Sequence, residues 1–464
     1  MNFKSARYII WSSIFLILLT GFLILLTQVQ ILKPAKPSII LIFVDCLRPD
    51  HLGCYGYPKN TSPNIDRFAE KGLLFENCFS HAPDTRLSYA SILTGFLPHE
   101  TRLMENIVLS AEVETLPEIL QQLGYKTIGV VSNYLLRRNR GWEQGFLIYD
   151  DTMNQYELVR QWPERIAEHT TDRAIELIKQ FHKNPLFMWI HYQDPHGPYT
   201  PPEPFSHMFR NQNQGSKTLK INRSFSGSGG IPSYQNLGAN PDFYYYLSQY
   251  DGEIAYLDEH FGRLIDALKE FGLYEEALII FSSDHGEGMG EHNYYFAHGE
   301  NLYNSLIHVP LIIKYGRQLK GRRTDFVQHI DIVPTIFNII GFRLNPYYRG
   351  SDLREKDIEG KEIFSEMDSF IVEDRIKFSL ILNSLKLIYT PLYQEYQLLD
   401  LKIDPYEKNN LIDRPKHQQQ AEDLKLRLHS ICKQDFLGIG LIPAPPQITN
   451  EEKQKLESLG YVQY

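Results

Sequence analysis

The sequence is poor in cysteine and has no excess of positive charge. Only four of its 464 residues are cysteine (Cys46, Cys54, Cys78 and Cys432), and none of them has C-x-x-C spacing. This excludes a zinc finger and a dense disulfide framework, and leaves open either one bridge, such as Cys54–Cys78, or free buried thiols. The 47 basic and 56 acidic side chains give a formal net charge of −9, so no overall basic surface indicates nucleic acid as a partner.

The one long hydrophobic run lies at the N-terminus. Residues 8–32 are 25 consecutive uncharged residues, enough for a helix to cross a membrane core of about 30 Å. No small-residue cleavage site follows the run, so residues 1–36 are predicted to be an uncleaved signal anchor with one transmembrane helix. Lys4 and Arg7 precede the run, and Lys33 and Lys36 follow it. This weak bias favours a single-pass membrane protein whose remaining chain is extracytoplasmic.

After the anchor, strand and helix patterns alternate. Residues 38–44, 186–192 and 277–281 are continuous apolar runs, typical of parallel strands buried on both faces. Amphipathic helical patterns lie between them, for example at residues 251–270, and Thr115 begins a capping box. The alternation predicts an α/β domain over residues 37–354, with a mainly parallel sheet flanked by helices.

The pattern changes beyond residue 355. Residues 376–382, 385–389 and 395–400 are short strand patterns with tight connections, as in an antiparallel meander. Helical patterns follow at about 420–431 and 451–459. Residues 355–464 are therefore predicted to form a smaller C-terminal subdomain with an antiparallel sheet and a tail helix. We find no internal repeats.

Polar side chains follow three of the apolar strands, at the end where α/β sheets bind ligands. They offer carboxylate oxygens and imidazole nitrogens, which are the groups used for metal binding and proton transfer near neutral pH. For Asp45 and His196, the alternative is a purely structural role at the end of a strand. The side chains are, in chain order, Asp45, Asp194, His196, Asp284, His285 and, after a further loop, His298.

The segment 83–95 predicts a loop that runs into a helix, with Thr85 where the loop ends. Backbone N–H groups at a helix start can hold an anion, and a hydroxyl there is a candidate nucleophile if another group lowers its pKa. The alternative is an ordinary helix cap. A divalent cation held by Asp45, Thr85, Asp284 and His285 would lower the pKa of that hydroxyl. His196 and His298 would then act on the substrate's anionic oxygens or on its leaving group.

Eight stretches, taken in order, resemble the sulfatase family, within the alkaline phosphatase superfamily. The resemblance covers nearly the whole chain from about Ser38. It implies a large α/β domain around a mixed sheet, a smaller C-terminal antiparallel subdomain, and one divalent metal under the nucleophile. The matching stretches are Val44–Tyr57, Ser62–Asp66, Ser91–Pro98, Asp194–His196, Tyr250–Asp258, Ser283–Glu287, His298–Tyr303 and Leu398–Pro405.

Several positions depart from the family pattern. Family sulfatases convert a Cys or Ser in a C/S-x-P-S-R context to formylglycine, and Thr85 occupies that position here. Thr cannot become formylglycine, so none is expected. The motif's Pro and Arg are Leu87 and Tyr89, and the second of the family's paired aspartates is Cys46. A Gly-Lys-Trp-His segment expected after the strand at 126–131 is replaced by Ser132-Asn133.

Thr is the nucleophile of the phosphoryl-transferring relatives, in which a carboxylate, a Thr, an Asp and a His bind one metal. Asp45, Thr85, Asp284 and His285 match that set. Its imidazole favours zinc or manganese, with calcium as the alternative. Arg48 and Asp194 lie in the matching motifs and are expected to bind the anionic ester substrate, carried by a glycan or a lipid.

Three functions remain open. The first is a membrane-anchored, metal-dependent sulfatase-family enzyme that hydrolyses or transfers a sulfate or phosphate ester through Thr85. The second is a phosphoethanolamine- or phosphoglycerol-type transferase acting on a cell-surface lipid or glycan. The third is a catalytically silent family member that binds anionic glycans. All four predicted metal ligands are present, which argues against a catalytically silent protein.

Overall fold

The structure is a computed structural model that describes residues 36–436, except 102, 104–107, 211–214, 239, 318, 344–345, 356–359 and 368–375. The predicted anchor and the predicted tail helix at 451–459 lie outside the described residues. Within the described part of the chain, no helix combines the length and the apolar character needed to cross a bilayer. The described residues from Ser38 onward belong to one compact unit.

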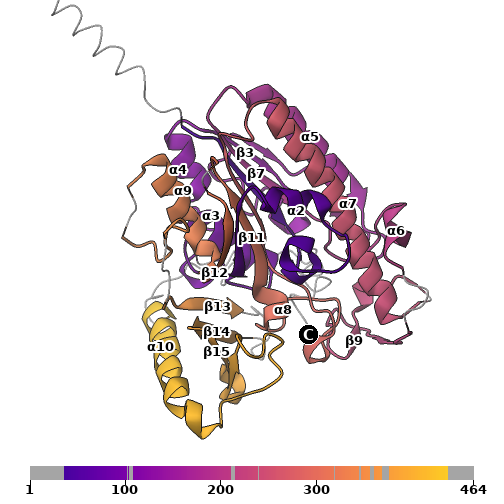
Figure 1. Cartoon of the computed structure of the whole chain (residues 1–464), viewed down its shortest axis with the longest axis vertical. Coiled ribbons are helices and arrows are strands. Elements are labelled where there is room, and N and C mark those ends of the chain that lie inside the picture. The colour runs from indigo at the N-terminus through magenta and orange to yellow at the C-terminus, as the bar shows by residue number, and fades with distance from the viewer. Residues whose placement is uncertain are drawn as a thin grey trace, which may run out of the picture. The chain divides into compact units, whose positions relative to one another are not determined.

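The core of this unit is an eight-stranded sheet in the order β12-β2-β11-β10-β1-β7-β3-β4 (Figure 1). Strands β10, β1, β7, β3 and β4 run parallel, β11 is antiparallel to both of its neighbours, and β12 pairs parallel with β2. The predicted large mixed, mainly parallel sheet is therefore confirmed. The strands are β1 Ile39–Val44, β2 Leu73–Phe79, β3 Lys126–Val130, β4 Ile148–Asp150, β7 Leu186–Tyr192, β10 Leu278–Ser283, β11 His308–Lys314 and β12 Gly321–Gln328.

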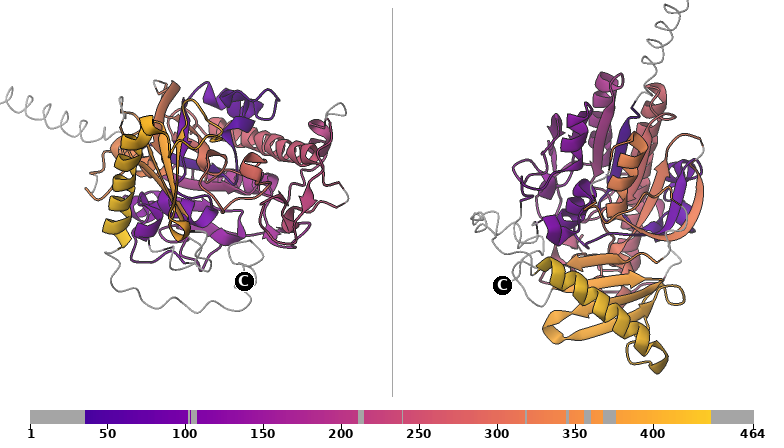
Figure 2. Two further views of the ribbon diagram at one scale, coloured as in Figure 1. Left: turned by 90° about the horizontal axis from the view of Figure 1, so that it is seen from below. Right: turned by 90° about the vertical axis from the view of Figure 1, so that its left-hand side faces the viewer.

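Helices cover both faces of the sheet, which explains why the central strands are apolar throughout. Ile40, Ile42 and Val44 of β1 pack with α2, α5 and α7, whereas Ile39, Leu41 and Phe43 pack with α3, α4 and α9. Figure 2 shows the two groups of helices from two further directions. The helices are α2 Pro63–Ala69, α3 Thr85–Thr94, α4 Leu116–Gln122, α5 Ala167–Phe181, α6 Phe205–Met208, α7 Phe243–Glu270, α8 Asn304–Ile307 and α9 Ile332–Ile340.

The C-terminal part forms the predicted antiparallel sheet, in the order β13-β14-β15-β16. Helix α10 (Gln418–Phe436) packs its Ala421, Leu424 and Leu428 against this sheet. Strand β13 joins the two parts, since the backbone N–H of Glu366 donates to the His81 carbonyl oxygen at 2.8 Å. The boundary at residue 355 stays a prediction. The strands are β13 Ile363–Met367, β14 Lys377–Leu382, β15 Leu385–Thr390 and β16 Glu395–Asp400.

Smaller features complete the fold. All four cysteines are free thiols, so the structure has no Cys54–Cys78 bridge. The predicted capping box is present, because the Thr115 and Glu118 side chains each accept a hydrogen bond from the other's backbone N–H. Two short two-stranded ribbons occur in the connections, β5 Gln155–Tyr156 with β6 Pro163–Glu164, and β8 Lys220–Ile221 with β9 Gly230–Ile231.

A buried carboxylate on α7 joins this helix to α2. Asp258 is 2% exposed and accepts hydrogen bonds from the backbone N–H groups of Asn64 and Ile65 at 2.8–3.0 Å. These two donors lie in the first turn of α2, where no helical carbonyl can accept them. Asp258 therefore caps α2 from a neighbouring helix.

We expect Asp258→Ala to lower the free energy of unfolding by about 1–3 kcal/mol, because it leaves buried N–H donors without acceptors. Asp266→Ala is the matched control on the same helix, since Asp266 is exposed and pairs only with Lys269. Urea unfolding of the two variants tests this. Equal stability of both would show that the cap contributes nothing.

Candidate active site

Side chains from β1, α3, β10 and the loop after β10 meet at the carboxyl edge of the sheet. The structure brings Thr85 next to His285, with 3.3 Å between Oγ1 and Nε2. The same Nε2 lies 3.6 Å from Asp45 Oδ1 and 3.6 Å from Asp284 Oδ2. All four side chains are fully buried. The four predicted metal ligands thus form one cluster, although its first and last members, Asp45 and His285, are 240 residues apart along the chain.

The hydrogen bonds of His285 show which of its nitrogens carries the proton. Its Nδ1 lies 2.9 Å from the Gly286 carbonyl oxygen, which can only accept, so Nδ1 carries the hydrogen. Burial, together with the neighbouring His298 ring, lowers the pKa of His285 to about 4, so the ring is neutral near pH 7. Nε2 therefore has the lone pair and accepts the hydrogen of the Thr85 hydroxyl, with oxygens of Asp45 and Asp284 beside it.

This arrangement leaves two buried carboxylates without a compensating cation. Among the described residues, no Lys or Arg forms an ion pair with Asp45 or Asp284, and Asp284 Oδ2 has no hydrogen-bond partner. Burial, and then the charge of Asp45, raise the pKa of Asp284 well above its usual range. Since buried charges are ordinarily paired or coordinate metals, the donor set fits a divalent cation.

His196 and His298 lie on the other side of the cluster, with their ring centroids 5.2 Å apart. His196 Nδ1 donates to the Gly197 carbonyl oxygen at 2.7 Å, so its Nε2 has the lone pair, and burial lowers the pKa of His196 to about 3. His298 Nδ1 faces Glu287 Oε1 at 3.3 Å. Burial disfavours the charged ring, but Glu287 outweighs it and raises the pKa of His298. One ring is thus held neutral, and the other is stabilised in its protonated form.

Cys46 belongs to the cluster, although the sequence offered it only as a departure from the family pattern. It has a left-handed backbone with φ of 58°. Its N–H donates to Asp284 Oδ1 at 3.3 Å, and its thiol donates to Asp45 Oδ1 at 3.2 Å. Burial, and next the charge of Glu287, raise the pKa of Cys46, so the thiol stays protonated.

Two further residues, to which the sequence analysis assigned no role in the site, lie at the second oxygen of Asp45. Asn133 Nδ2 donates to Asp45 Oδ2 at 2.6 Å, and His191 Nε2 lies 3.6 Å from the same oxygen. His191 Nδ1 accepts the backbone N–H of Ser132 at 3.4 Å, which leaves the ring hydrogen on Nε2. Both residues leave Oδ1 facing the cluster. A His inside an otherwise apolar strand was the available signal for His191.

The start of α3 differs from the expectation that its N–H groups receive an anion. Asp84 Oδ1 already accepts the N–H groups of Arg86 and Leu87, at 3.1 and 3.2 Å. The residue before the candidate nucleophile is therefore a carboxylate that caps the helix, and these two amides are not available to a substrate. Thr85 itself is the first residue of α3 rather than its cap.

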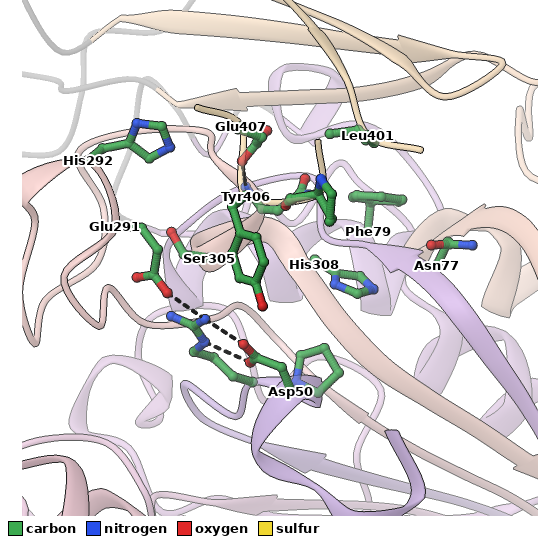
Figure 3. A pocket seen from close by; sticks show the side chains of 14 residues that line it. Asp50, Asn77, Phe79, Glu291, His292, Ser305, His308, Leu401, Tyr406 and Glu407 are labelled. Carbon is green, nitrogen blue, oxygen red and sulfur yellow. Dashed lines mark hydrogen bonds and ion pairs between the residues drawn. The ribbon is translucent and has the colours of Figure 1, made fainter. Parts of the chain in front are cut away.

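Arg48 lies beside a separate cavity next to the C-terminal part. Its guanidinium donates to Asp50 and Glu291 at 2.7–2.9 Å, and Figure 3 labels these two carboxylates with their hydrogen bonds as dashed lines. Its third nitrogen donates to the Glu287 carbonyl oxygen at 2.9 Å. The guanidinium of Arg48 thus contacts the backbone of Glu287, and the Arg48 backbone N–H is linked to the Cys46 carbonyl oxygen through the Tyr250 hydroxyl. Its predicted contact with the substrate stays a prediction.

Asp194 also lies apart from the metal-type cluster. Its carboxyl group and that of Glu253 affect each other's pKa, and Glu253 Oε1 accepts the backbone N–H of Thr200 at 2.6 Å. Burial raises the pKa of Asp194 to about 6. This places Asp194 in a carboxyl pair under the loop that carries His196, and its predicted role in substrate binding stays a prediction.

Comparison with known proteins identifies the family. The sulfatase family model matches residues 37–342, and the model for the C-terminal part of N-sulphoglucosamine sulphohydrolase matches residues 290–434. The chain belongs to the sulfatase family. As a member of this family, it is an enzyme of the sulfuric ester hydrolase class. Sulfatases generally use a divalent metal ion, which agrees with the donor set described above.

Several sulfatases and solved structures are similar. The N-acetylglucosamine-6-O-sulfatase of Bacteroides thetaiotaomicron is 24% identical over 86% of this chain and 87% of its own. Human iduronate 2-sulfatase is 26% identical over a region that covers 67% of this chain and 70% of the human protein. A protein solved with its substrate D-glucosamine-2-N,6-O-disulfate has a TM-score of 0.72 at 20% identity over 86% and 98%. The phosphonate monoester hydrolase of Agrobacterium radiobacter has a TM-score of 0.69 at 20% identity over 86% and 96%.

We predict that the purified chain binds about one divalent ion and that chelation lowers its free energy of unfolding by about 3 kcal/mol, the linkage expected at about 100 times the dissociation constant. Asp45→Asn and Asp284→Asn should lose the ion. They should keep the stability of the metal-free protein, because an amide in place of either carboxyl group removes the repulsion that contributes to the raised pKa of Asp284. Elemental analysis and thermal unfolding, each with and without chelator, measure both effects.

Asp50→Asn is the control, since Asp50 pairs with Arg48 outside the cluster. The assignment of the metal ligands would be contradicted if the Asp284→Asn variant kept its full metal content. It would also be contradicted if the Asp50→Asn variant lost as much metal as the Asp284→Asn variant.

Proposed function

We propose that this sulfatase-family enzyme cleaves an anionic ester by attack of the Thr85 hydroxyl, with the ion held by Asp45, Asp284 and His285. The observation that supports this most is the 3.3 Å contact of Thr85 Oγ1 with His285 Nε2, at the point where the two carboxylates converge. A divalent ion there would supply Lewis-acid stabilisation of the nucleophile and of the ester oxygens. The N-terminal segment is proposed to anchor the enzyme, with this site extracytoplasmic.

The chain's own residues provide the remaining steps. The Thr85 hydroxyl gives its proton to solvent and takes one back when the bound group is released. In between, Oγ1 forms a bond to the sulfur or phosphorus of the ester, and the bond to the leaving-group oxygen breaks. His298, whose pKa is raised against the effect of burial chiefly by Glu287, donates a proton to that oxygen. Nε2 of His196 then accepts a proton from the attacking water or hydroxyl, since its Nδ1 hydrogen is fixed on Gly197. The ester on Thr85 is released by this second attack.

The natural substrate is proposed to be a sulfated glycan. Two of the similar proteins, the N-acetylglucosamine-6-O-sulfatase and the iduronate 2-sulfatase, have names that refer to sugars. Their similarity covers 86% and 67% of this chain. The segment that follows β16, within the second family match, lines the cavity beside Arg48 with Leu401, Tyr406 and Glu407 (Figure 3).

Phosphoryl transfer is the second candidate, and Thr85 is the observation that favours it. A formylglycine sulfatase releases its product by breaking a carbon–oxygen bond of the aldehyde hydrate, and a Thr ester cannot do so. Release here requires attack on the sulfur or phosphorus itself, and an acceptor hydroxyl can replace water in that step. The phosphoethanolamine- or phosphoglycerol-type reaction therefore stays a proposal beside sulfate hydrolysis.

We expect Thr85→Ala to reduce kcat/KM at least about 1000-fold, because it removes the attacking oxygen, whereas Thr85→Ser should stay within about tenfold of the wild type. The full chain should be assayed with an aryl sulfate, an aryl phosphate monoester and an aryl phosphodiester. Thr94→Ala is the matched control, since Thr94 ends the same helix and bonds only to backbone there.

The ester that is turned over fastest decides between the two reactions. Mass spectrometry of the quenched wild type should find the sulfo or phospho group on the peptide that contains Thr85. Undiminished activity of Thr85→Ala would refute the nucleophile, and inertness of the metal-loaded wild type towards all three esters would favour the silent glycan binder.

A further inference from the structure

A basic groove lies at the amino-end edge of the large sheet, opposite the active site. It has a volume of about 630 Å³ and lies between α2, the end of α7, the turn before β10 and the turn between β11 and β12. Its basic lining residues are Arg67, Lys71, Lys269, Lys314, Arg317 and Lys320.

The groove is positive although the protein is acidic. Glu70, Asp266 and Glu275 also line it, so six basic and three acidic groups leave 6 − 3 = +3, against −9 for the whole chain. Lys269 pairs with Asp266 at 2.9 Å, and Lys314 is 3.6 Å from Glu275.

Three exposed cations of the groove have no such partner. Lys71, Arg317 and Lys320 form no ion pair with any residue that the structure describes. Lys314 lies at the floor of the groove, 2% exposed, with its Nζ donating to the Tyr274 carbonyl oxygen at 2.5 Å. The groove therefore presents unneutralised positive charge around a rigid floor.

The groove also lies close to the point where the chain enters the sheet. The backbone N–H of Leu278 in β10 donates to the Ser38 carbonyl oxygen at 2.8 Å, and Lys314 of β11 pairs with Ile279 of β10. Since neighbouring strands are about 4.8 Å apart, Lys314 lies roughly 10 Å from Ser38 across the sheet. The segment 33–37, between the predicted anchor and Ser38, can span about 18 Å at most.

We infer that this groove docks on anionic phospholipid headgroups of the membrane that holds the anchor. The inference rests on the proposed anchor. Each basic side chain near a charged bilayer surface strengthens attraction to it, and the attraction falls off within a Debye length of about 8–10 Å. The short tether keeps the groove within reach of that layer.

Docking in this way would also orient the enzyme. The groove and the active site lie at opposite ends of β1 and β10, whose six residues span about 20 Å. The active site would therefore face away from the bilayer. The preferred ester is one that projects from the surface, as on a glycan chain, rather than one at the level of the headgroups.

The test uses the full chain in nanodiscs of phosphatidylcholine alone or with 30% phosphatidylglycerol, a membrane composition chosen as roughly that of an anionic surface. Amide hydrogen exchange is followed in peptides covering residues 71–73 and 315–321. We expect about tenfold slower exchange in the anionic discs, and loss of this difference in 0.5 M salt, as roughly expected for a screened charge interaction.

The triple variant Lys71→Glu/Arg317→Glu/Lys320→Glu should lose this protection. The matched control Lys402→Glu/Arg414→Glu/Lys416→Glu changes the same residue types at exposed positions of the C-terminal part and should keep it. Equal exchange in both kinds of disc, or protection that survives in the groove variant, would overturn the inference.

Two further outcomes separate it from related ideas. Protection induced by added heparin in phosphatidylcholine discs, and not by phosphatidylglycerol, would assign the groove to an anionic glycan and overturn lipid docking. If the chain does not co-elute with phosphatidylcholine discs, the anchor proposal fails by itself. Lipid docking by the groove is then tested by flotation of the protein with phosphatidylglycerol vesicles. Flotation of the wild type but not of the groove variant would support the inference, and no flotation of the wild type would overturn it.

Discussion

The active site depends on one constraint, which is that two buried carboxylates are held side by side without a basic partner. Parallel pairing of β1 with β10 aligns Val44 with Ser283, so Asp45 and Asp284 leave the sheet next to each other. Desolvation and mutual repulsion oppose this arrangement, and a bound cation relieves both. The neutral nitrogen of His285, the thiol of Cys46 and the hydroxyl of Thr85 are placed around this charge.

Backbone carbonyl groups decide how the imidazoles act. Gly286 and Gly197 each take the Nδ1 hydrogen of the preceding histidine, which turns both Nε2 lone pairs inward. For His298, the group next to Nδ1 is the Glu287 carboxylate instead of a backbone carbonyl, and this carboxylate favours the charged ring. In the proposed mechanism the same residue type thus serves as ligand, as base and as acid, according to what its Nδ1 contacts.

Much of this could be predicted from local sequence, for identifiable reasons. β1, β7 and β10 were found because both of their faces are buried and they contain almost only apolar residues. β2 and β12 were missed. Glu76 and Asn77 interrupt the apolar pattern of β2, and β12 is an edge strand with Arg322, Arg323 and Asp325. The C-terminal strand β13 was also missed, whereas the three hairpin-connected strands after it were found because their turns are short.

The sequence by itself determined which chemical groups stand at strand ends, that a Thr stands at the start of helix α3, and that the chain alternates strands with helices. Only the tertiary structure decided which strand ends are neighbours. Asn133 and His191 reach Asp45 because the sheet order places β7 beside β1 and β3 beside β7. Backbone hydrogen bonds are alike for every residue, so they cannot specify this order locally. It is set by the packing of both sheet faces, to which residues far apart in the chain contribute together.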